Sequence, residues 1–117
     1  MNRLQIVIID GQGGRMGKGI VEQLKKRFPD LPLTAVGTNS IATAAMMKAG
    51  ADWGATGENP VVVNSRSADV IIGPVGIVIA DALMGEISPA MAVAVGQARA
   101  RRILIPLNQC KSEAKRS

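Results

Sequence analysis

The clearest candidate for chemistry in this sequence is the glycine turn "GQGGRMG" at residues 11–17. In turns of this spacing, Gly11 allows a tight bend, Gly13 lets the backbone approach an anion, and Gly17 allows a helix to pack closely on a strand. An apolar run precedes the turn and a helical pattern follows it, so N–H groups at the helix start would face the anion. The turn predicts a phosphate-binding site, and the alternative is a bare strand-to-helix corner. Its members are Gly11, Gln12, Gly13, Gly14, Arg15, Met16 and Gly17.

Few other side chains in the sequence are suited to catalysis or metal binding. The chain has no histidine and a single cysteine, Cys110, so it has no imidazole acid, base or metal ligand and no four-thiolate zinc site. Asp52 and Glu58 flank a glycine-spaced loop and are candidates for an acid–base pair or for metal ligands, although solvated loop carboxylates are commoner. The sequence therefore identifies no catalytic residue, and we expect no metal.

The net charge of +5 is concentrated at the C-terminus, because residues 99–117 hold six cations and one anion. Nucleic-acid binding is not expected, since basic residues are neither spread over the chain nor mixed with stacking aromatics. The basic residues 111–117 are expected to form a disordered tail. The N-terminus does not resemble a secretory signal, and the uncharged runs are too short to span a bilayer. These features predict a cytoplasmic protein with no membrane association.

Strand and helix patterns alternate along the chain, which predicts one α/β domain over residues 1–110. We expect strands at residues 4–10, 31–37, 61–63, 68–74 and 101–108, and helices at residues 15–28, 41–50, 75–84 and 89–100. The architecture is a Rossmann-like three-layer αβα domain with a mostly parallel sheet of four to five strands. Only four residues separate the strand at 61–63 from the next, too few for a parallel crossover, so its pairing stays open.

Ligands of such sheets bind beyond the carboxyl ends of the strands, where Thr38, Asn39, Gly73 and Pro74 are expected. The second strand ends in the neutral "GTNS" rather than in the acidic residue that holds the ribose of NAD, which favours NADP(H) or another nucleotide. Thr38 and Asn39 would then meet a phosphate, with Arg66 as the nearest cation through the fold. Alternatively, these polar residues are only helix caps.

Asp10 ends the first strand, beside the position predicted for the phosphate. Its carboxylate would repel that ligand unless Lys18 or Arg15 pairs with it or a cation bridges the two. We expect instead that Asp10 accepts backbone N–H groups of its own turn.

The turn "GQGGRMG" is similar to that of the dihydrodipicolinate reductases, Rossmann-fold enzymes that use NADH or NADPH. This local resemblance implies cofactor contacts from residues 11–17, but the chain lacks the catalytic domain and histidines of those enzymes. Over nearly its whole length the chain resembles a bacterial family catalogued as domain of unknown function 3842. That resemblance is carried by "IDGQGG", "GTNSIATAAMMKAGA", "GATGEN", "ADVIIGP" and "ILIPLN", and it implies a shared fold without an assigned activity.

Three functions fit these observations. The first is a binding module for a nucleotide or a small phosphorylated metabolite, with its ligand at residues 11–17. The second is a small NADP(H)-dependent oxidoreductase whose site a dimer partner completes, and the third is a structural or interaction protein with an empty turn. The helix at residues 41–49 carries a single charge, Lys48, which predicts a homodimer through this helix.

Overall fold

The five strands of the protein form one parallel sheet. The computed structural model describes residues 4–106, and its strands lie in the order β3-β2-β1-β4-β5. The strands are β1 (Ile6–Asp10), β2 (Leu33–Gly37), β3 (Trp53–Thr56), β4 (Val70–Pro74) and β5 (Arg101–Ile105). Asp10 lies opposite Gly37 in the register of β1 and β2, so both strands end at the same edge, called here the carboxyl edge. The predicted Rossmann-like α/β fold is confirmed.

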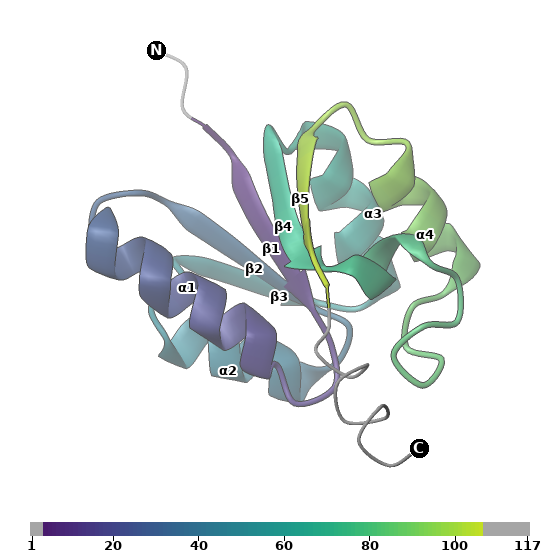
Figure 1. Ribbon diagram of the computed structural model, residues 1–117, viewed down its shortest axis with the longest axis horizontal. Coiled ribbons are helices and arrows are strands. Elements are labelled where there is room, and N and C mark those ends of the chain that lie inside the picture. The colour runs from purple at the N-terminus through teal and green to yellow at the C-terminus, as the bar shows by residue number, and fades with distance from the viewer. Residues whose placement is uncertain (1–3, 107–117) are drawn as a thin grey trace.

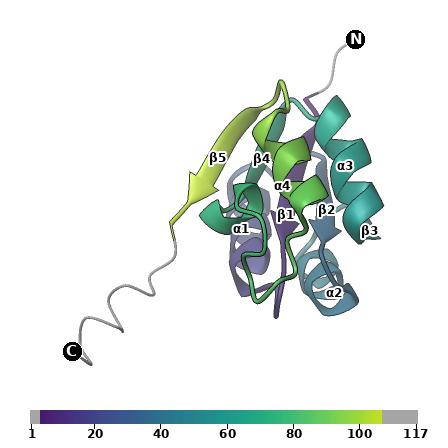
Figure 2. The same cartoon turned by 90° about the vertical axis from the view of Figure 1, so that its right-hand side faces the viewer.

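Two helices cover each face of this sheet. The helices α1 (Arg15–Arg27) and α2 (Ser40–Lys48) lie on one face, and α3 (Glu58–Ser67) and α4 (Pro89–Gly96) lie on the other (Figure 1). β5 forms the edge beside β4, as Figure 2 shows. Alternate residues of β1 point to opposite faces, which produces two separate cores. Ile8 packs in the core with α1 and α2, whereas Ile9 packs in the core with α3 and α4.

The predicted strand at residues 61–63 is wrong, because these valines lie in α3. Glu58 in the first turn and Pro60 beside it suit a helix start, and Val61 gains almost complete burial against the core. The third strand is instead β3, inside the predicted loop. It is a four-residue edge strand and mostly exposed, so it has no continuous apolar run. Since α3 connects β3 to β4, the sheet contains no crossover that is too short.

The predicted helix at residues 75–84 is also mostly wrong. A short 3-10 helix, η1 (Val75–Val78), is followed by turns and bends over residues 79–87. Asp81, Leu83 and Met84 take positive φ angles of 69°, 57° and 58°, which no α-helix tolerates. This segment leads back to the carboxyl edge before α4 begins.

The helix start predicted after it is confirmed. The Ser88 hydroxyl accepts the N–H of Met91 at 3.2 Å, and Pro89 is the first residue of α4. Within residues 4–106, no helix combines the length and the hydropathy needed to cross a membrane. The predicted domain end at residue 110, the basic tail and Cys110 lie outside the described residues.

Candidate functional site

The glycine turn connects β1 to α1 through two residues in the left-handed region of φ. Gln12 has φ 50° and Gly14 has φ 74°, and the N–H of Gly14 closes the turn onto the carbonyl of Gly11 at 2.9 Å. A Cβ atom at position 14 would also lie 2.7 Å from the Cα of Ala42 in α2. Glycine at this position therefore serves both the bend and the close packing of α1 on α2.

Gly17 and Gly13 differ sharply in what surrounds them. A Cβ atom at Gly17 would lie 2.5 Å from Met46 Sδ and 2.9 Å from Asp10 Cβ, so α1 packs closely on its neighbours there, as predicted. At Gly13 the nearest atom would be Arg15 Cγ at 3.9 Å, and the φ of Gly13 is not positive. The fold itself therefore requires glycine at position 17 but not at position 13.

Asp10 is bound within its own turn, as the sequence predicts. Its two carboxylate oxygens accept the N–H of Gly11 at 2.8 Å and the N–H of Gly17 at 2.6 Å, and the residue is 5% exposed. Burial raises the pKa of Asp10, the two N–H donors partly offset that rise, and the nearby negative charge of Glu86 adds to it. Asp10 thus accepts the N–H of Gly17, the third residue of α1, as a helix cap does. It accepts no hydrogen bond from the N–H groups of Arg15 and Met16.

Three backbone N–H groups at the start of α1 have no acceptor within residues 4–106. They belong to Gly13, Arg15 and Met16, on either side of the left-handed Gly14. The first turn of a helix carries a partial positive charge and donors that point outward. Arg15 and Lys18 add two cations near this turn, and neither forms an ion pair in the described part of the chain. This combination is suited to binding the oxygens of a phosphate or diphosphate.

Glu86 is a residue of this site that sequence reasoning missed. Its Oε1 atom accepts three hydrogen bonds: from the N–H of Gln12 at 2.7 Å, from Thr38 Oγ1 at 2.5 Å and from Asn39 Nδ2 at 3.0 Å. Burial opposes ionisation of Glu86, but the three hydrogen bonds outweigh it and hold the pKa of Glu86 below its usual value. Glu86 lies 74 residues from Gln12 in sequence, just beyond the helix predicted at residues 75–84, so no local pattern pointed to it.

The structure brings Thr38 and Asn39 to the glycine turn, as predicted. Asn39 Nδ2 donates to the carbonyl of Gln12 at 3.0 Å, and Asn39 Oδ1 accepts the N–H of Ala42 at 2.9 Å. Asn39 therefore caps α2, as one of the two alternatives drawn from the sequence has it, and it also joins the turn, whereas a phosphate contact by Thr38 or Asn39 stays a prediction. The amide of Asn39 is fixed by contacts on both of its polar atoms.

Gly73 and Pro74 lie at the carboxyl end of β4, and both are buried. A Cβ atom at Gly73 would collide with the carbonyl of Ile9, so close packing of β4 on β1 accounts for this glycine. A ligand contact by Gly73 or Pro74 stays a prediction.

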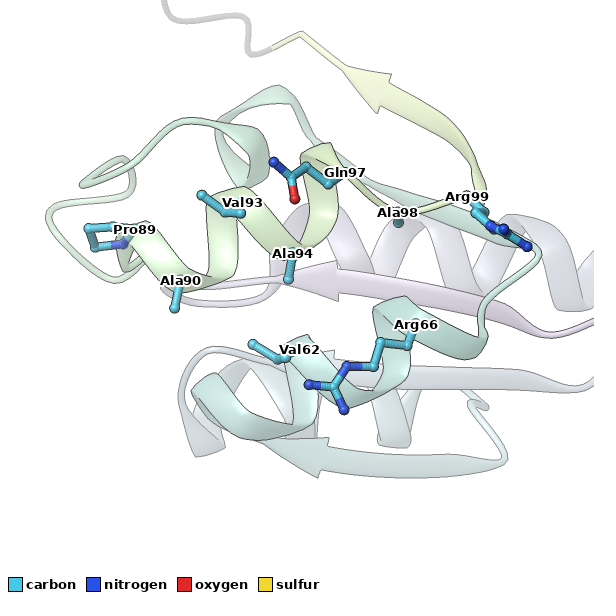
Figure 3. A pocket seen from close by; sticks show the side chains of 9 residues that line it. All are labelled: Val62, Arg66, Pro89, Ala90, Val93, Ala94, Gln97, Ala98 and Arg99. Atoms are coloured by element: carbon cyan, nitrogen blue, oxygen red, sulfur yellow. The ribbon is translucent and has the colours of Figure 1, made fainter.

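Arg66 does not lie near Thr38, contrary to expectation. The predicted strand at residues 61–63 would have ended just before Arg66, but residues 64–67 form the last turn of α3, which has crossed from the carboxyl edge to the opposite edge of the sheet. Arg66 instead lines a cavity of about 670 Å³ between α3 and α4. Figure 3 shows it together with Val62 of α3 and with Ala90 and Ala94 of α4.

Asp52 and Glu58 do not form a pair, because they lie at opposite ends of β3. Asp52 accepts Lys25 Nζ at 2.7 Å and the N–H of Leu33 at 2.9 Å. The hydrogen bond from Lys25 holds the pKa of Asp52 below its usual value, and that from Leu33 adds to the effect. Asp52 therefore joins the start of β3 to α1 and to β2 and has a structural role. Among residues 4–106, no three acidic, histidine or cysteine side chains converge as metal ligands would.

The fold and the turn define a Rossmann-like α/β protein with a glycine-rich turn at the sheet's switch point, where the chain crosses from β3 to β4 on the far side of β1. The chain belongs to the family described as a domain of unknown function, DUF3842, whose family model matches residues 5–115. No curated protein and no solved structure matches the chain.

Proposed function

We propose that the protein binds a nucleotide or a small phosphorylated metabolite through its phosphate groups at residues 11–17. The observation that carries this proposal is the set of three N–H groups, of Gly13, Arg15 and Met16, that find no acceptor within residues 4–106. They lie at the N-terminus of a thirteen-residue helix and at the sheet's switch point. A phosphate there would accept hydrogen bonds from donors that are already oriented.

The surroundings of Gly13 support the same proposal. Neither backbone conformation nor packing against the chain requires glycine at this position, because a Cβ atom would have no neighbour closer than 3.9 Å. We expect a Cβ atom there, bonded directly to the backbone of Gly13, to obstruct a phosphate that approached its N–H group. Glycine at position 13 is thus explained by access to the backbone rather than by the fold.

A binding module fits better than the two alternatives. The NADP(H)-dependent oxidoreductase would need a cation for the 2′-phosphate beside Thr38, and Arg66, the candidate for it, lies at the opposite edge of the sheet. The structural alternative leaves the N–H groups of Gly13, Arg15 and Met16 without a role.

A homodimer through residues 41–49 is part of this proposal. Ile41 is 68% exposed and Met47 is 37% exposed on α2, although Ala42 and Met46 of the same helix are fully buried. A second subunit would bury these apolar side chains, and that burial would favour association.

Thermal unfolding of the purified protein tests the proposal directly. The ligands would be ADP, ATP, NADH, NADPH, S-adenosylmethionine, inorganic pyrophosphate and inorganic phosphate. A ligand at a hundred times its Kd adds about 2.7 kcal/mol to the free energy of unfolding, which raises the Tm of a domain of this size by several degrees. We expect at least one diphosphate-containing ligand to raise the Tm. If the whole panel leaves the Tm unchanged, residues 11–17 form only a structural corner.

A further inference from the structure

Glu86 places a negative charge at the end of β2, where the sequence shows only neutral residues. Its Oε1 atom takes three donors, from Gln12, Thr38 and Asn39, whereas its Oε2 atom accepts no hydrogen bond within residues 4–106. The three donors fix the carboxylate in position. The second oxygen stays available as an acceptor beside the glycine turn.

A carboxylate at this position selects between two kinds of ligand group. An ionised carboxylate only accepts hydrogen bonds, so it binds a hydroxyl group and repels a phosphate. In doubly wound sheets, an acidic residue at the end of the second strand binds the ribose hydroxyls of a nucleotide in this way. Glu86 reaches the same place from the segment between β4 and α4.

The groups beside Glu86 match the order in which a nucleotide carries its ribose and its phosphates. Glu86 holds the N–H of Gln12, and the N–H groups without acceptors begin at the next residue, Gly13. A hydroxyl acceptor therefore lies directly beside a diphosphate-binding helix start. In a nucleoside diphosphate the ribose and the phosphates are adjacent in the same manner.

We propose that Glu86 makes the site specific for nucleotides with free ribose hydroxyls, and that it rejects those carrying a 2′-phosphate. This inference rests on the function proposed above and names its substrate class: the adenosine diphosphate part of a molecule such as NADH, rather than that of NADPH. The Oε2 atom of Glu86 accepts a hydrogen bond from a ribose hydroxyl. The N–H groups of Gly13, Arg15 and Met16 bind the diphosphate.

The neighbours of Glu86 make it a fixed acceptor. Ile87, the next residue, is 1% exposed and belongs to the core under α4, and Asn39 is held by Gln12 and Ala42. A phosphate that displaced Glu86 would break all three of its hydrogen bonds. A hydroxyl group that donates to the Oε2 atom breaks none of them.

Calorimetric titration with NADH and with NADPH tests the inference, because the two differ only in the 2′-phosphate. For the unaltered protein we expect NADH to bind about tenfold to a hundredfold more tightly, the range expected for one hydrogen bond to a charged group. Glu86→Gln should reduce this ratio to about threefold or less, since a neutral amide no longer repels the phosphate. Asp81→Asn removes an exposed carboxylate from the same segment and should leave the ratio unchanged.

Each other outcome has a distinct meaning. Equal affinity of the unaltered protein for NADH and NADPH overturns the inference and leaves the proposed phosphate site standing, and this comparison needs no variant. If Glu86→Gln binds NADH, NADPH and inorganic pyrophosphate all more tightly, Glu86 is an internal competitor of phosphate and the inference is wrong. If the unaltered protein binds neither NADH nor NADPH but binds another ligand of the panel above, the inference is wrong and the proposed phosphate site stands. If it binds no ligand of that panel, the proposed function itself fails and the inference fails with it.

Discussion

Replacing Gly13 with alanine should separate ligand binding from folding. The new Cβ atom would meet no atom closer than 3.9 Å, and the φ of Gly13 lies outside the left-handed region. Alanine at such a position restricts the unfolded chain and should stabilise the free protein by about 0.4–1 kcal/mol. The same methyl group would obstruct a phosphate at the N–H groups of Gly13 and its neighbours. Losing one hydrogen bond to a charged group corresponds to a rise in Kd of about tenfold to a hundredfold.

The assay pairs thermal unfolding of the free variant with calorimetric titration of the tightest ligand found among the nucleotides. Gly19→Ala is the matched control, because a Cβ atom at Gly19 also meets nothing within 4 Å and lies further along α1. Both variants should unfold at the same or a higher temperature than the unaltered protein. Only Gly13→Ala should bind weakly. Undiminished affinity of Gly13→Ala would refute the argument that glycine at position 13 provides access for a ligand.

Three further outcomes follow from the same structure. Gly17→Ala should destabilise the protein by about 1–3 kcal/mol, because its methyl group would collide with Met46 and Asp10, and denaturant unfolding beside Gly19→Ala measures this loss. The pKa of Glu86 is lowered by folding, so its stabilising effect is complete above its ordinary value of 4.5 and is lost as the pH falls through the lower folded value. The Tm difference between the unaltered protein and Glu86→Gln should therefore shrink below pH 4.5, and a constant difference would contradict the assignment. Ile41→Glu should convert a dimer into a monomer in sedimentation analysis, whereas an unchanged mass would exclude residues 41–49 as the interface.

The sequence predicted those parts of the fold that local patterns determine. The continuous apolar run of β1 is buried at every position, and α1 begins at Arg15, the residue at which the sequence predicts its start. The start of α4 could also be predicted, because serine followed by proline is a common pair at the N-cap and the first position of a helix. Asp10 could be assigned to its own turn because its partners lie within seven residues.

The errors arose where tertiary contacts outweigh local preference. The valines at residues 61–63 favour a strand by composition, but burial of Val61 against the sheet and the helix start at Glu58 place them in α3. β3 escaped notice because an exposed four-residue edge strand needs no apolar pattern. The prediction for Arg66 was wrong for the same reason. Residues 64–67 end a helix instead of following a strand, so Arg66 lies at the edge of the sheet opposite to the carboxyl edge.

Glu86 shows the limit of a single sequence most clearly. Its three donors come from two segments that are distant from it in sequence. The segment that contains Glu86 turns through non-glycine residues with positive φ, which no local sequence pattern predicts. The residues that follow β2 in the sequence are neutral and supply no carboxylate. The chain supplies a carboxylate to that place from the far side of β4.

The measurement that tests the central claim most directly is an NMR titration of backbone amides with ADP. A phosphate bound at the start of α1 should produce its largest amide shifts at Gly13, Arg15 and Met16, whose N–H groups have no acceptor in the described part of the chain. The N–H groups of Gly11 and Gly17 already donate to Asp10 and should shift much less. Shifts confined to the cavity between α3 and α4, or no shifts at all, would contradict the assignment of residues 11–17 as the phosphate-binding site.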